Sequence, residues 1–492
     1  MKLFFSKNIC LLLSIFISLN IVFLPYTLNF FIGNHDWDWV KGTTQVLSLT
    51  TGLFEARYAK FILNVLLFSG HIFPILNNIV SFFLLSFGIV LLTNYWNIKN
   101  TKHQFLISLF IAFQPFILGW LYFPINILGN FSIISLVVGG VILSEQNKIF
   151  SNLLAILFFE LALGVYPSGV ETILIVFSFK HIVNQAENKT ILRSFTIVLL
   201  SIVLFKVLLL VLAHYNLIVS DYYNLKTSTL SYIISNIGQY AKIFFEQFYV
   251  TSPFVSISLK ITSLIIVILA LISSFNTKKN AVLWAICLTS TMLSVVLTPN
   301  IEEVAFQPRI NFYGLGFLYL GSCAVLLVNS KILLKNIGYV LSILYIIISI
   351  NNDLYAQKVW ELGKTAETNL VLRMVKRIED NSTTLPLIPV LTDEISLRPR
   401  YYNENYDKNS PYLLERSFVV RHIPSGMFNF YLPQNLFYTT SQISTISPKL
   451  YRYLLTTTSI WPEKNSIYLD DKYAIIISTP KGLNAIKQQL PK

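Results

Sequence analysis

The chain has 492 residues, of which 54% are hydrophobic and only 12% are charged, and its mean hydropathy is +0.61. Ordinary soluble domains contain about 25% charged residues, so this composition excludes a soluble globular protein and predicts a polytopic helical membrane protein. The formal net charge of +13 does not require nucleic acid as a partner, because Lys and Arg beside membrane spans act as cytoplasmic anchors.

Apolar runs long enough to cross about 30 Å of hydrocarbon recur along the first part of the chain. The first run follows Lys2 and Lys7 and precedes no small-residue cleavage site, which is typical of a retained span rather than a removed signal peptide. A run from Phe61 to Phe73 is too short to cross and predicts an interfacial or re-entrant piece. About eleven spans are predicted in all, at residues 8–32, 73–96, 104–123, 126–144, 149–166, 169–184, 192–213, 256–275, 281–298, 310–328 and 337–350.

The charge of alternate loops predicts the orientation of these spans. One set of loops holds 12 Lys or Arg against two acids. The opposite set, with Lys260 and Glu171 near the ends of their spans included, holds seven basic and eight acidic residues. Because cytoplasmic loops carry the excess of Lys and Arg, we expect a cytoplasmic N-terminus and, with eleven spans, an external C-terminal segment. The basic set comprises the N-terminus and residues 97–103, 145–148, 180–193, 276–280 and 330–336.

The composition changes near residue 350. Residues 1–350 form the predicted membrane domain, with outer-face loops at 33–60, 214–255 and 298–309, and residues 351–492 form a polar segment without a spanning run. This segment is long enough for one small α+β domain. A long amphipathic helix is predicted from Asp353 to Asp380. Strands are predicted at 385–391, 418–420, 466–469 and 473–478, the last two forming a hairpin.

Several common chemical motifs are absent from the sequence. Cys10, Cys287 and Cys323 all fall in predicted spans, so none can staple an external domain by a disulfide. The chain has no Walker A, GxGxxG, His-Glu-x-x-His or Cys-x-x-Cys motif. The sequence therefore indicates no required cofactor and no metal site, although a divalent metal stays possible.

The first outer loop carries the main catalytic candidates, in the stretch Gly33-Asn34-His35-Asp36-Trp37-Asp38-Trp39. Asp36 or Asp38 would serve as a general base that removes a proton from an attacking hydroxyl. Trp37 and Trp39 are either interfacial belt residues or contacts to the face of a sugar ring. Later in the same loop, Arg57 and Lys60 would hold a phosphate.

A late outer loop offers a second group, Glu302 and Glu303 followed by Arg309. The two carboxylates would bind an acceptor sugar or a divalent ion, and Arg309 would contact a phosphate. The alternative is a solvated turn with Arg309 at the membrane interface.

Two charges deep within predicted spans need an account, Glu160 in the fifth and Lys206 in the seventh. Charges in hydrocarbon normally face a partner or a wet cavity. We expect one of two arrangements. Either Glu160 and Lys206 form an ion pair within the bundle, or Lys206 contacts the phosphate of a lipid in the outer half of the bilayer.

With these features the chain resembles the GtrII-like family of bacterial glucosyltransferases, which modify O-antigen, convert serotype and have the GT-C architecture. The resemblance rests on the number of spans, the acidic first loop, Glu55-Ala56-Arg57-Tyr58 and a soluble tail of this size. In the tail, the stretch from Asn351 to Ile378 resembles the family's exit helix. The segment Trp461-Pro462-Glu463-Lys464, followed by Ile467 to Ser478, resembles its closing Pro-containing strand pair. Where the family often has Gly-Arg-Trp, this chain has Ala56-Arg57-Tyr58, which keeps the arginine and leaves the role of the aromatic open.

The resemblance implies a GT-C-like bundle of about 11 helices in the bacterial inner membrane with a periplasmic C-terminal domain. It implies transfer of a sugar, usually glucose, from a polyprenyl-phosphate carrier to a lipid-linked O-antigen repeat of lipopolysaccharide on the periplasmic face. Asp36 or Asp38 would be the base, Arg57 the first donor-phosphate contact, and Lys464 or Lys472 a further one.

Two other classes of function compete with this interpretation. A flippase or transporter of lipid-linked saccharide would show internal repeats and use mid-membrane charges. An O-antigen polymerase or ligase would more naturally carry a large loop between late spans. We find no internal repeat in the sequence, and the polar segment is terminal.

Overall fold

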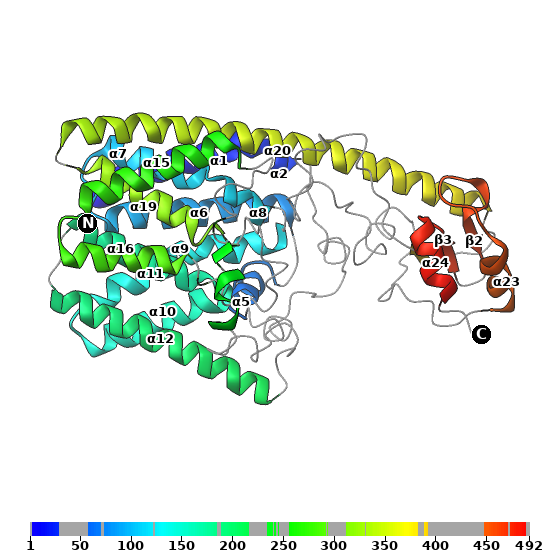
Figure 1. Cartoon of the computed structure of the whole chain (residues 1–492), viewed down its shortest axis with the longest axis horizontal. Coiled ribbons are helices and arrows are strands. Elements are labelled where there is room, and N and C mark those ends of the chain that lie inside the picture. The colour runs from blue at the N-terminus through cyan, green and yellow to red at the C-terminus, as the bar shows by residue number, and fades with distance from the viewer. Residues whose placement is uncertain are drawn as a thin grey trace. The chain divides into compact units, whose positions relative to one another are not determined.

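The computed structural model describes residues 2–28, 58–69, 73–121, 124–184, 188–215, 234–239, 241–242, 245, 255–291, 293, 311–329, 331–381, 388–391, 447–470 and 473–488. The chain forms two compact units, and the boundary between them falls between Ala356 and Gln357. The long helix α20 (Ile332–Asn381) contributes to both units. We describe each unit by itself (Figure 1).

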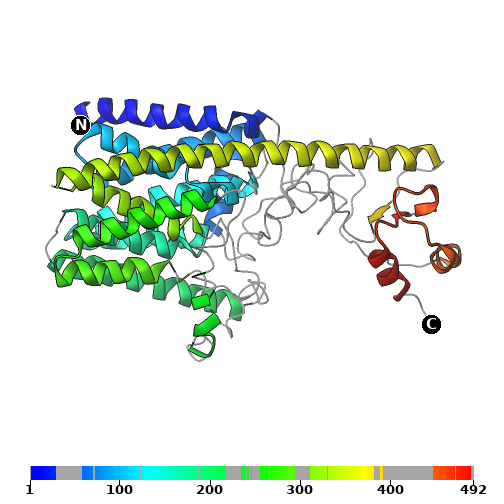
Figure 2. The same ribbon diagram turned by 45° about the horizontal axis from the view of Figure 1, so that its top comes forward.

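The first unit is a bundle of apolar helices that run side by side in both views (Figures 1 and 2). Six helical stretches of the described chain are long and apolar enough to cross a membrane, and three shorter ones are apolar. This makes the chain a membrane protein. Helices lie over all eleven predicted spans, but the number that crosses the bilayer stays a prediction. The helices are α1 (Lys2–Val22), α2 (Leu24–Leu28), α5 (Tyr58–Phe68), α6 (Pro74–Tyr95), α7 (Thr101–Ala112), α8 (Leu118–Leu121), α9 (Pro124–Ser144), α10 (Ile149–Val165), α11 (Gly169–Asn184), α12 (Asn188–His214), α15 (Ile257–Ser274), α16 (Lys278–Ser290), α19 (Leu315–Leu327) and the first part of α20.

Local sequence accounts for where these helices begin and break. Asn100 caps α7 by accepting hydrogen bonds from the backbone N–H groups of Lys102 and His103, as a helix N-terminus requires. Pro115 follows α7 and opens a short 3-10 turn, Pro115–Ile117, before α8, because proline supplies no N–H to the preceding helix. The helix α5 has 11 residues, roughly 16 Å at 1.5 Å per residue, so the prediction that this segment is too short to cross is confirmed.

Aromatic rings fill the middle of the bundle. Phe23 of α1 stacks on Phe82 of α6 at 5.6 Å between ring centroids, and Phe82 stacks on Phe131 of α9 at 6.2 Å. Phe110 of α7 stacks on Tyr345 of α20 at 3.8 Å. These contacts join helices that are far apart in sequence into one apolar core.

The outward face of the bundle is apolar as well. On α12, Val203, Val207 and Leu210 are 58%, 48% and 48% exposed. Large exposed apolar side chains at this helical spacing are costly in water and favourable in lipid. The face of α12 therefore suits hydrocarbon.

Polar contacts tie several helix ends together at one end of the bundle, which we call the basic end. Tyr95 at the end of α6 donates a hydrogen bond to the Glu145 carboxylate after α9, at 2.7 Å. Lys180 of α11 donates to the backbone oxygen of Tyr95, and Arg193 of α12 donates to that of Glu145. One end of the bundle thus holds the C-termini of α6, α9 and α11 and the start of α12. The loop charges predicted that these helix ends lie on the same side.

The second unit contains the second part of α20, a three-stranded sheet and two short helices. The strands are β1 (Ile388–Leu391), β2 (Ile467–Leu469) and β3 (Tyr473–Ile476), in the order β1-β3-β2. The pairing of β2 with β3 is antiparallel, which confirms the predicted hairpin, and β1 pairs with β3 in parallel. The predicted strand at residues 418–420 lies outside the described residues.

The sequence reading missed both short helices of this unit, α23 (Pro448–Thr456) and α24 (Pro480–Gln488). Their apolar residues, among them Leu450, Leu454 and Leu483, pack with Tyr468 and Ile475 of the hairpin in one small core. The exit helix predicted from Asp353 to Asp380 is present, but it is continuous with the last apolar run in α20.

A glycine on α19 marks a very tightly packed point of the bundle and gives a stability prediction. A methyl group on Gly321 would lie 2.0 Å from the ring of Phe179, and that buried ring packs against Trp96 and Trp284. Overpacking of this kind costs about 1–3 kcal/mol. We expect Gly321→Ala to lower the thermal unfolding temperature of the purified protein in detergent.

Gly238 supplies the matched control, because a methyl group there would meet no atom within 4 Å. The Gly238→Ala variant should unfold at the wild-type temperature or slightly above it. Equal unfolding temperatures for the two variants would contradict the packing described at Gly321.

Candidate functional site

The end of the bundle opposite the basic end holds a second set of contacts, and we call it the site end. Tyr26 of α2 donates a hydrogen bond to the backbone oxygen of Leu121 at 2.6 Å. Tyr58, the first residue of α5, donates to the backbone oxygen of Glu160 in α10 at 3.1 Å. The ends of α2, α8 and α10 and the start of α5 therefore meet here.

Three aromatic rings and two polar side chains form a buried cluster at the site end. The ring of Trp120 lies 4.9 Å from that of Tyr166 and 5.6 Å from that of Tyr313. The two tyrosine rings stack at 5.7 Å, and the Tyr313 hydroxyl donates to Asn130 Oδ1 at 3.1 Å. Glu171 completes this polar–aromatic cluster. Its residues come from α8, α9, the C-terminal end of α10, α11 and the segment before α19.

Glu171 is fully buried in the first turn of α11. A methyl group built on Gly314 would lie 2.8 Å from Glu171 Oε2, so the carboxylate lies against the N-terminus of α19. Carboxylates are favourable at helix N-termini, where backbone N–H groups point outward. Glu171 thus lies beside the turn that carries Tyr313, and the neighbouring Thr172 hydroxyl donates to the backbone oxygen of Tyr313 at 3.3 Å.

Polar atoms of this region lack protein partners. Both amide atoms of Gln114 and the indole nitrogen of Trp120 are buried without a hydrogen-bond partner among the described residues. Gln114 lies against α19, since a methyl group on Gly316 would come 1.7 Å from its Oε1. Leaving such a buried group unpaired costs about 1–3 kcal/mol. A hydroxylated ligand would supply the missing partners.

The expected pairing of Glu160 with Lys206 is wrong. No ion pair joins them in the described structure, and the buried Oε1 of Glu160 has no hydrogen-bond partner there. Lys206 is exposed on α12 next to Val203 and Val207, on the apolar outward face. Similar depth in the two spans did not suffice, because the side chains leave their helices in different directions.

Most of the site residues predicted from sequence lie outside the described residues, so their positions stay predictions. Lys60 lies in α5, with its side chain outside the described set. The others are Asp36, Trp37, Asp38, Trp39, Arg57, Glu302, Glu303, Arg309 and Lys472.

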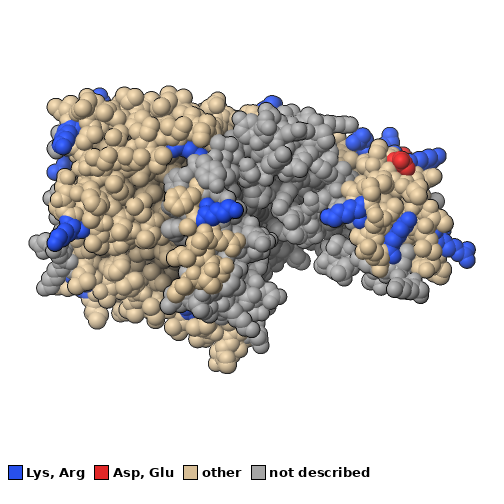
Figure 3. All heavy atoms as spheres, viewed as in Figure 1, with Lys and Arg blue, Asp and Glu red and all other residues tan. Residues whose placement is uncertain are grey.

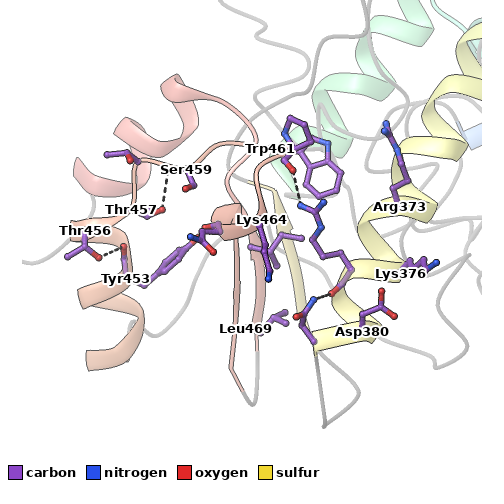
Figure 4. A pocket seen from close by; sticks show the side chains of 16 residues that line it. Arg373, Lys376, Asp380, Tyr453, Thr456, Thr457, Ser459, Trp461, Lys464 and Leu469 are labelled. Carbon is purple, nitrogen blue, oxygen red and sulfur yellow. Dashed lines mark hydrogen bonds between the residues drawn. The ribbon is translucent and has the colours of Figure 1, made fainter.

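Lys464 belongs to the second unit, where it lines a cavity of about 950 Å³. The walls come from the last turns of α20 and from the segment between α23 and β2 (Figure 4). Arg373, Lys376 and Arg377 are the other basic residues of its lining, and Asp380 is the acidic one. On the face shown in Figure 3, Lys and Arg are frequent on the surface of this unit.

The sequence reading missed the polar–aromatic cluster at the site end. Glu171 was placed only as a residue of an apolar run, and Trp120, Tyr166 and Tyr313 were counted as span residues. A usable signal was present, since each of these residues lies near the same end of its predicted span.

Taken together, the bundle and its two ends define a membrane-embedded helical protein with a buried polar–aromatic site at the end remote from its basic loops. A comparison with protein families adds the chemistry: the family described as glucosyl transferase GtrII matches residues 43–320. This match covers more than half of the chain, which therefore belongs to the GtrII glucosyl transferase family. No curated protein matches the chain.

Membership confirms the resemblance seen in the sequence and implies that the chain is a glucosyltransferase. The matched range includes Arg57, Lys60, Lys206 and the whole polar–aromatic cluster. It begins after Asp36 and Asp38 and ends before the second unit.

The hydrogen bond from Tyr313 to Asn130 gives a prediction for this cluster. Removing a buried donor costs about 1–2 kcal/mol, so Tyr313→Phe should lower the unfolding temperature in detergent and reduce glucosyl transfer. Tyr319→Phe is the control, because this tyrosine is also buried and its hydroxyl has no hydrogen-bond partner among the described residues. Equal losses in both variants would argue against a specific role for the Tyr313 hydroxyl.

Proposed function

We propose that this glucosyltransferase moves a sugar, glucose in the first instance, from a polyprenyl-phosphate carrier to a lipid-linked O-antigen repeat. The reaction takes place at the site end, on the periplasmic face of the inner membrane. The observation that carries the proposal is the buried polar–aromatic cluster in a chain of the GtrII family. Aromatic faces and unpaired amide groups are the surfaces that a sugar ring with several hydroxyls would use.

The sidedness rests on charge. The basic loops belong on the cytoplasmic side by the positive-inside rule, and the described ends of α6, α9 and α11 meet with the start of α12 at that end. The N-terminus is then cytoplasmic and the site end is periplasmic. A lipid-linked donor and acceptor both reach that face by lateral diffusion, so no nucleotide-binding loop is needed.

The first loop supplies the general base. The loop joins α2 to α5, and described residues at both of its borders, Tyr26 and Tyr58, contact the site end. Asp36 or Asp38 takes the proton from the acceptor hydroxyl as its oxygen attacks the anomeric carbon. The bond from that carbon to the phosphate oxygen breaks, its electron pair leaves with the polyprenyl phosphate, and the configuration at the anomeric carbon inverts.

Cations near the membrane surface hold the leaving phosphate. Arg57 is the first candidate, since its planar guanidinium makes paired hydrogen bonds to phosphate oxygens, with Lys60 and Arg309 beside it in our proposal. Lys206 lies eight residues before His214 at the end of α12, roughly 12 Å along the helix. Its ammonium group can extend toward the outer interface and meet a lipid phosphate there. For sugar contacts we propose Trp37 and Trp39, with Glu302 and Glu303 on the acceptor side.

The transporter alternative has lost its main support. A flippase would use Glu160 and Lys206 as a charge pair inside the bundle, but the two do not pair and Lys206 is exposed on the outward face. Family membership likewise favours a transferase.

The base assignment predicts the effect of two substitutions. Asp36→Asn and Asp38→Asn should both insert and fold, and at least one should reduce transfer from polyprenyl-phosphate glucose by roughly 10²–10⁴-fold, the usual contribution of a positioned base. Transfer of radiolabelled glucose into lipopolysaccharide in membrane vesicles measures this.

Glu361→Gln is the control, since Glu361 makes an exposed ion pair with Lys358 at 2.9 Å and such pairs contribute little. This variant should transfer at the wild-type rate. Wild-type transfer by the double variant Asp36→Asn/Asp38→Asn would refute the assignment of the base.

The phosphate role of Lys206 is tested separately. Lys206→Met keeps the length of the side chain and its apolar surroundings but removes the charge, so the KM for polyprenyl-phosphate glucose should rise several-fold at an unchanged unfolding temperature. Lys148→Met, at an exposed position before α10, should leave the KM unchanged. If both variants keep the wild-type KM, Lys206 does not contact the donor phosphate.

A further inference from the structure

The cavity of the second unit lies outside the part of the chain that matches the GtrII family. All of its lining residues fall between Arg373 and Leu469, whereas the match ends at residue 320. Its volume of about 950 Å³ is at the upper end of the range of roughly 300–1,000 Å³ for pockets that bind small molecules. It is large enough for a ligand of several rings.

The electrostatics of this cavity favour an anion. Arg373, Lys376 and Lys464 line it and have neither a hydrogen bond nor an ion pair with any residue of the described structure. Asp380 also lines it but forms no ion pair with these three cations. Because no described residue pairs with these positive charges, they are available for phosphate or carboxylate oxygens.

The frame around these cations is fixed by other contacts. Arg377 donates hydrogen bonds to the backbone oxygens of Pro462 and Glu463, each at 3.0 Å, and its guanidinium lies 4.6 Å from the centre of the Trp461 ring. These contacts attach α20 to the segment that precedes the hairpin, as Figure 4 shows. Arg377 therefore shapes the cavity, while the three other cations stay open to a ligand.

The opposite wall is rich in hydroxyl groups. Residues 456–459 are three threonines and a serine, and all four line the cavity. Tyr453 donates a hydrogen bond to the backbone oxygen of Asn465 at 2.7 Å. Burial raises the pKa of Tyr453, which keeps this phenol protonated as a donor. Hydroxyl side chains on one wall and an indole ring on the other suit a saccharide, whose own surface alternates hydroxyl groups and apolar C–H groups.

We propose that this cavity binds an anionic saccharide, with the phosphate or carboxylate group against Arg373, Lys376 and Lys464 and a sugar ring beside Trp461. The inference rests on the proposed function: in that setting the ligand is the acceptor glycan, and the polar unit selects it. Lys464, which the family resemblance offered as a donor-phosphate contact, is thereby assigned to the acceptor.

The test measures binding to the full-length protein in detergent by calorimetry. The probes are trigalacturonate, an acidic trisaccharide, and maltotriose, a neutral one. Wild-type protein should bind trigalacturonate at least tenfold more tightly than maltotriose, and added salt should weaken that binding because exposed charges are screened. Arg373→Gln/Lys464→Gln should weaken trigalacturonate binding at least tenfold.

The control variant is Lys449→Gln/Lys481→Gln, which removes the same charge from exposed positions of α23 and α24. It should bind like wild type. If both double variants weaken trigalacturonate binding equally, the effect comes from overall charge and the proposal is overturned. Equal affinity of the wild-type protein for the acidic and neutral probes would also overturn it. Inorganic phosphate is a third probe, and binding of phosphate as tight as that of trigalacturonate would overturn the saccharide assignment.

A transfer assay separates this inference from the proposed function. Arg373→Gln/Lys464→Gln should raise the KM for an acidic lipid-linked acceptor and leave kcat unchanged, whereas Asp36→Asn/Asp38→Asn should abolish transfer and keep trigalacturonate binding. Absence of transfer in wild type with intact trigalacturonate binding would refute the proposed function alone. Intact transfer with an unchanged acceptor KM in the cavity variant would refute the cavity proposal alone.

Discussion

The cost of leaving a polar group without a partner in hydrocarbon governs this structure. Within the bilayer each backbone N–H and C=O must be satisfied inside its own helix, and charged side chains are expensive there. The described spans meet this condition with helices whose exposed faces are apolar, as on α12. Side chains that need partners are accordingly found where helices end.

The two ends of the bundle use their polar groups differently. At the basic end hydrogen bonds among Tyr95, Glu145, Lys180 and Arg193 hold four helices in place, although Arg193 Nε and both ring nitrogens of His181 have no hydrogen-bond partner among the described residues. At the site end Gln114 and the indole of Trp120 have no partner within the described structure. Natural proteins leave such buried groups unpaired in few places, and at the site end these groups lie beside the polar–aromatic cluster, where the proposed ligand would complete their hydrogen bonding.

Much of the fold could be predicted because its signals are local. An apolar helix needs only a long apolar run, and the β2–β3 hairpin needs two short strands with a tight connection. The gathering of basic loops at one end of the bundle needs only the loop charges. The helices α23 and α24 escaped because nine residues with three or four apolar positions resemble a polar loop in a single sequence.

The sites were less accessible to prediction because their residues come together only in the folded chain. The hydrogen bond between Asn130 and Tyr313 joins positions 183 residues apart, and Arg373 and Lys464 line one cavity from different segments. Nothing in the spacing of these residues predicts that they meet. The failed pairing of Glu160 with Lys206 has the same origin, since depth along a helix says nothing about the face from which a side chain leaves it.

The proposed substrates would call for a division of recognition between the two units. A polyprenyl-phosphate sugar is recognised by its phosphate and one sugar ring, because its long tail is as apolar as the surrounding lipid and offers little specificity. An acceptor glycan differs from other saccharides in the arrangement of its hydroxyl and acidic groups. A protein can read that arrangement only with a shaped polar surface that displaces water from the glycan. A bundle face cannot provide that surface, whereas a polar unit with open cations can.

Weak binding in such a cavity would suffice for selectivity. The proposed donor and acceptor are both lipid-linked and so confined to one membrane, and tethering a ligand near its site raises its effective concentration without any new contact. An acceptor held by a few charge-assisted hydrogen bonds would therefore occupy the cavity long enough to present its hydroxyl, and would still dissociate after transfer. Strong binding would be a disadvantage, because retention of the glucosylated product would block the next turnover.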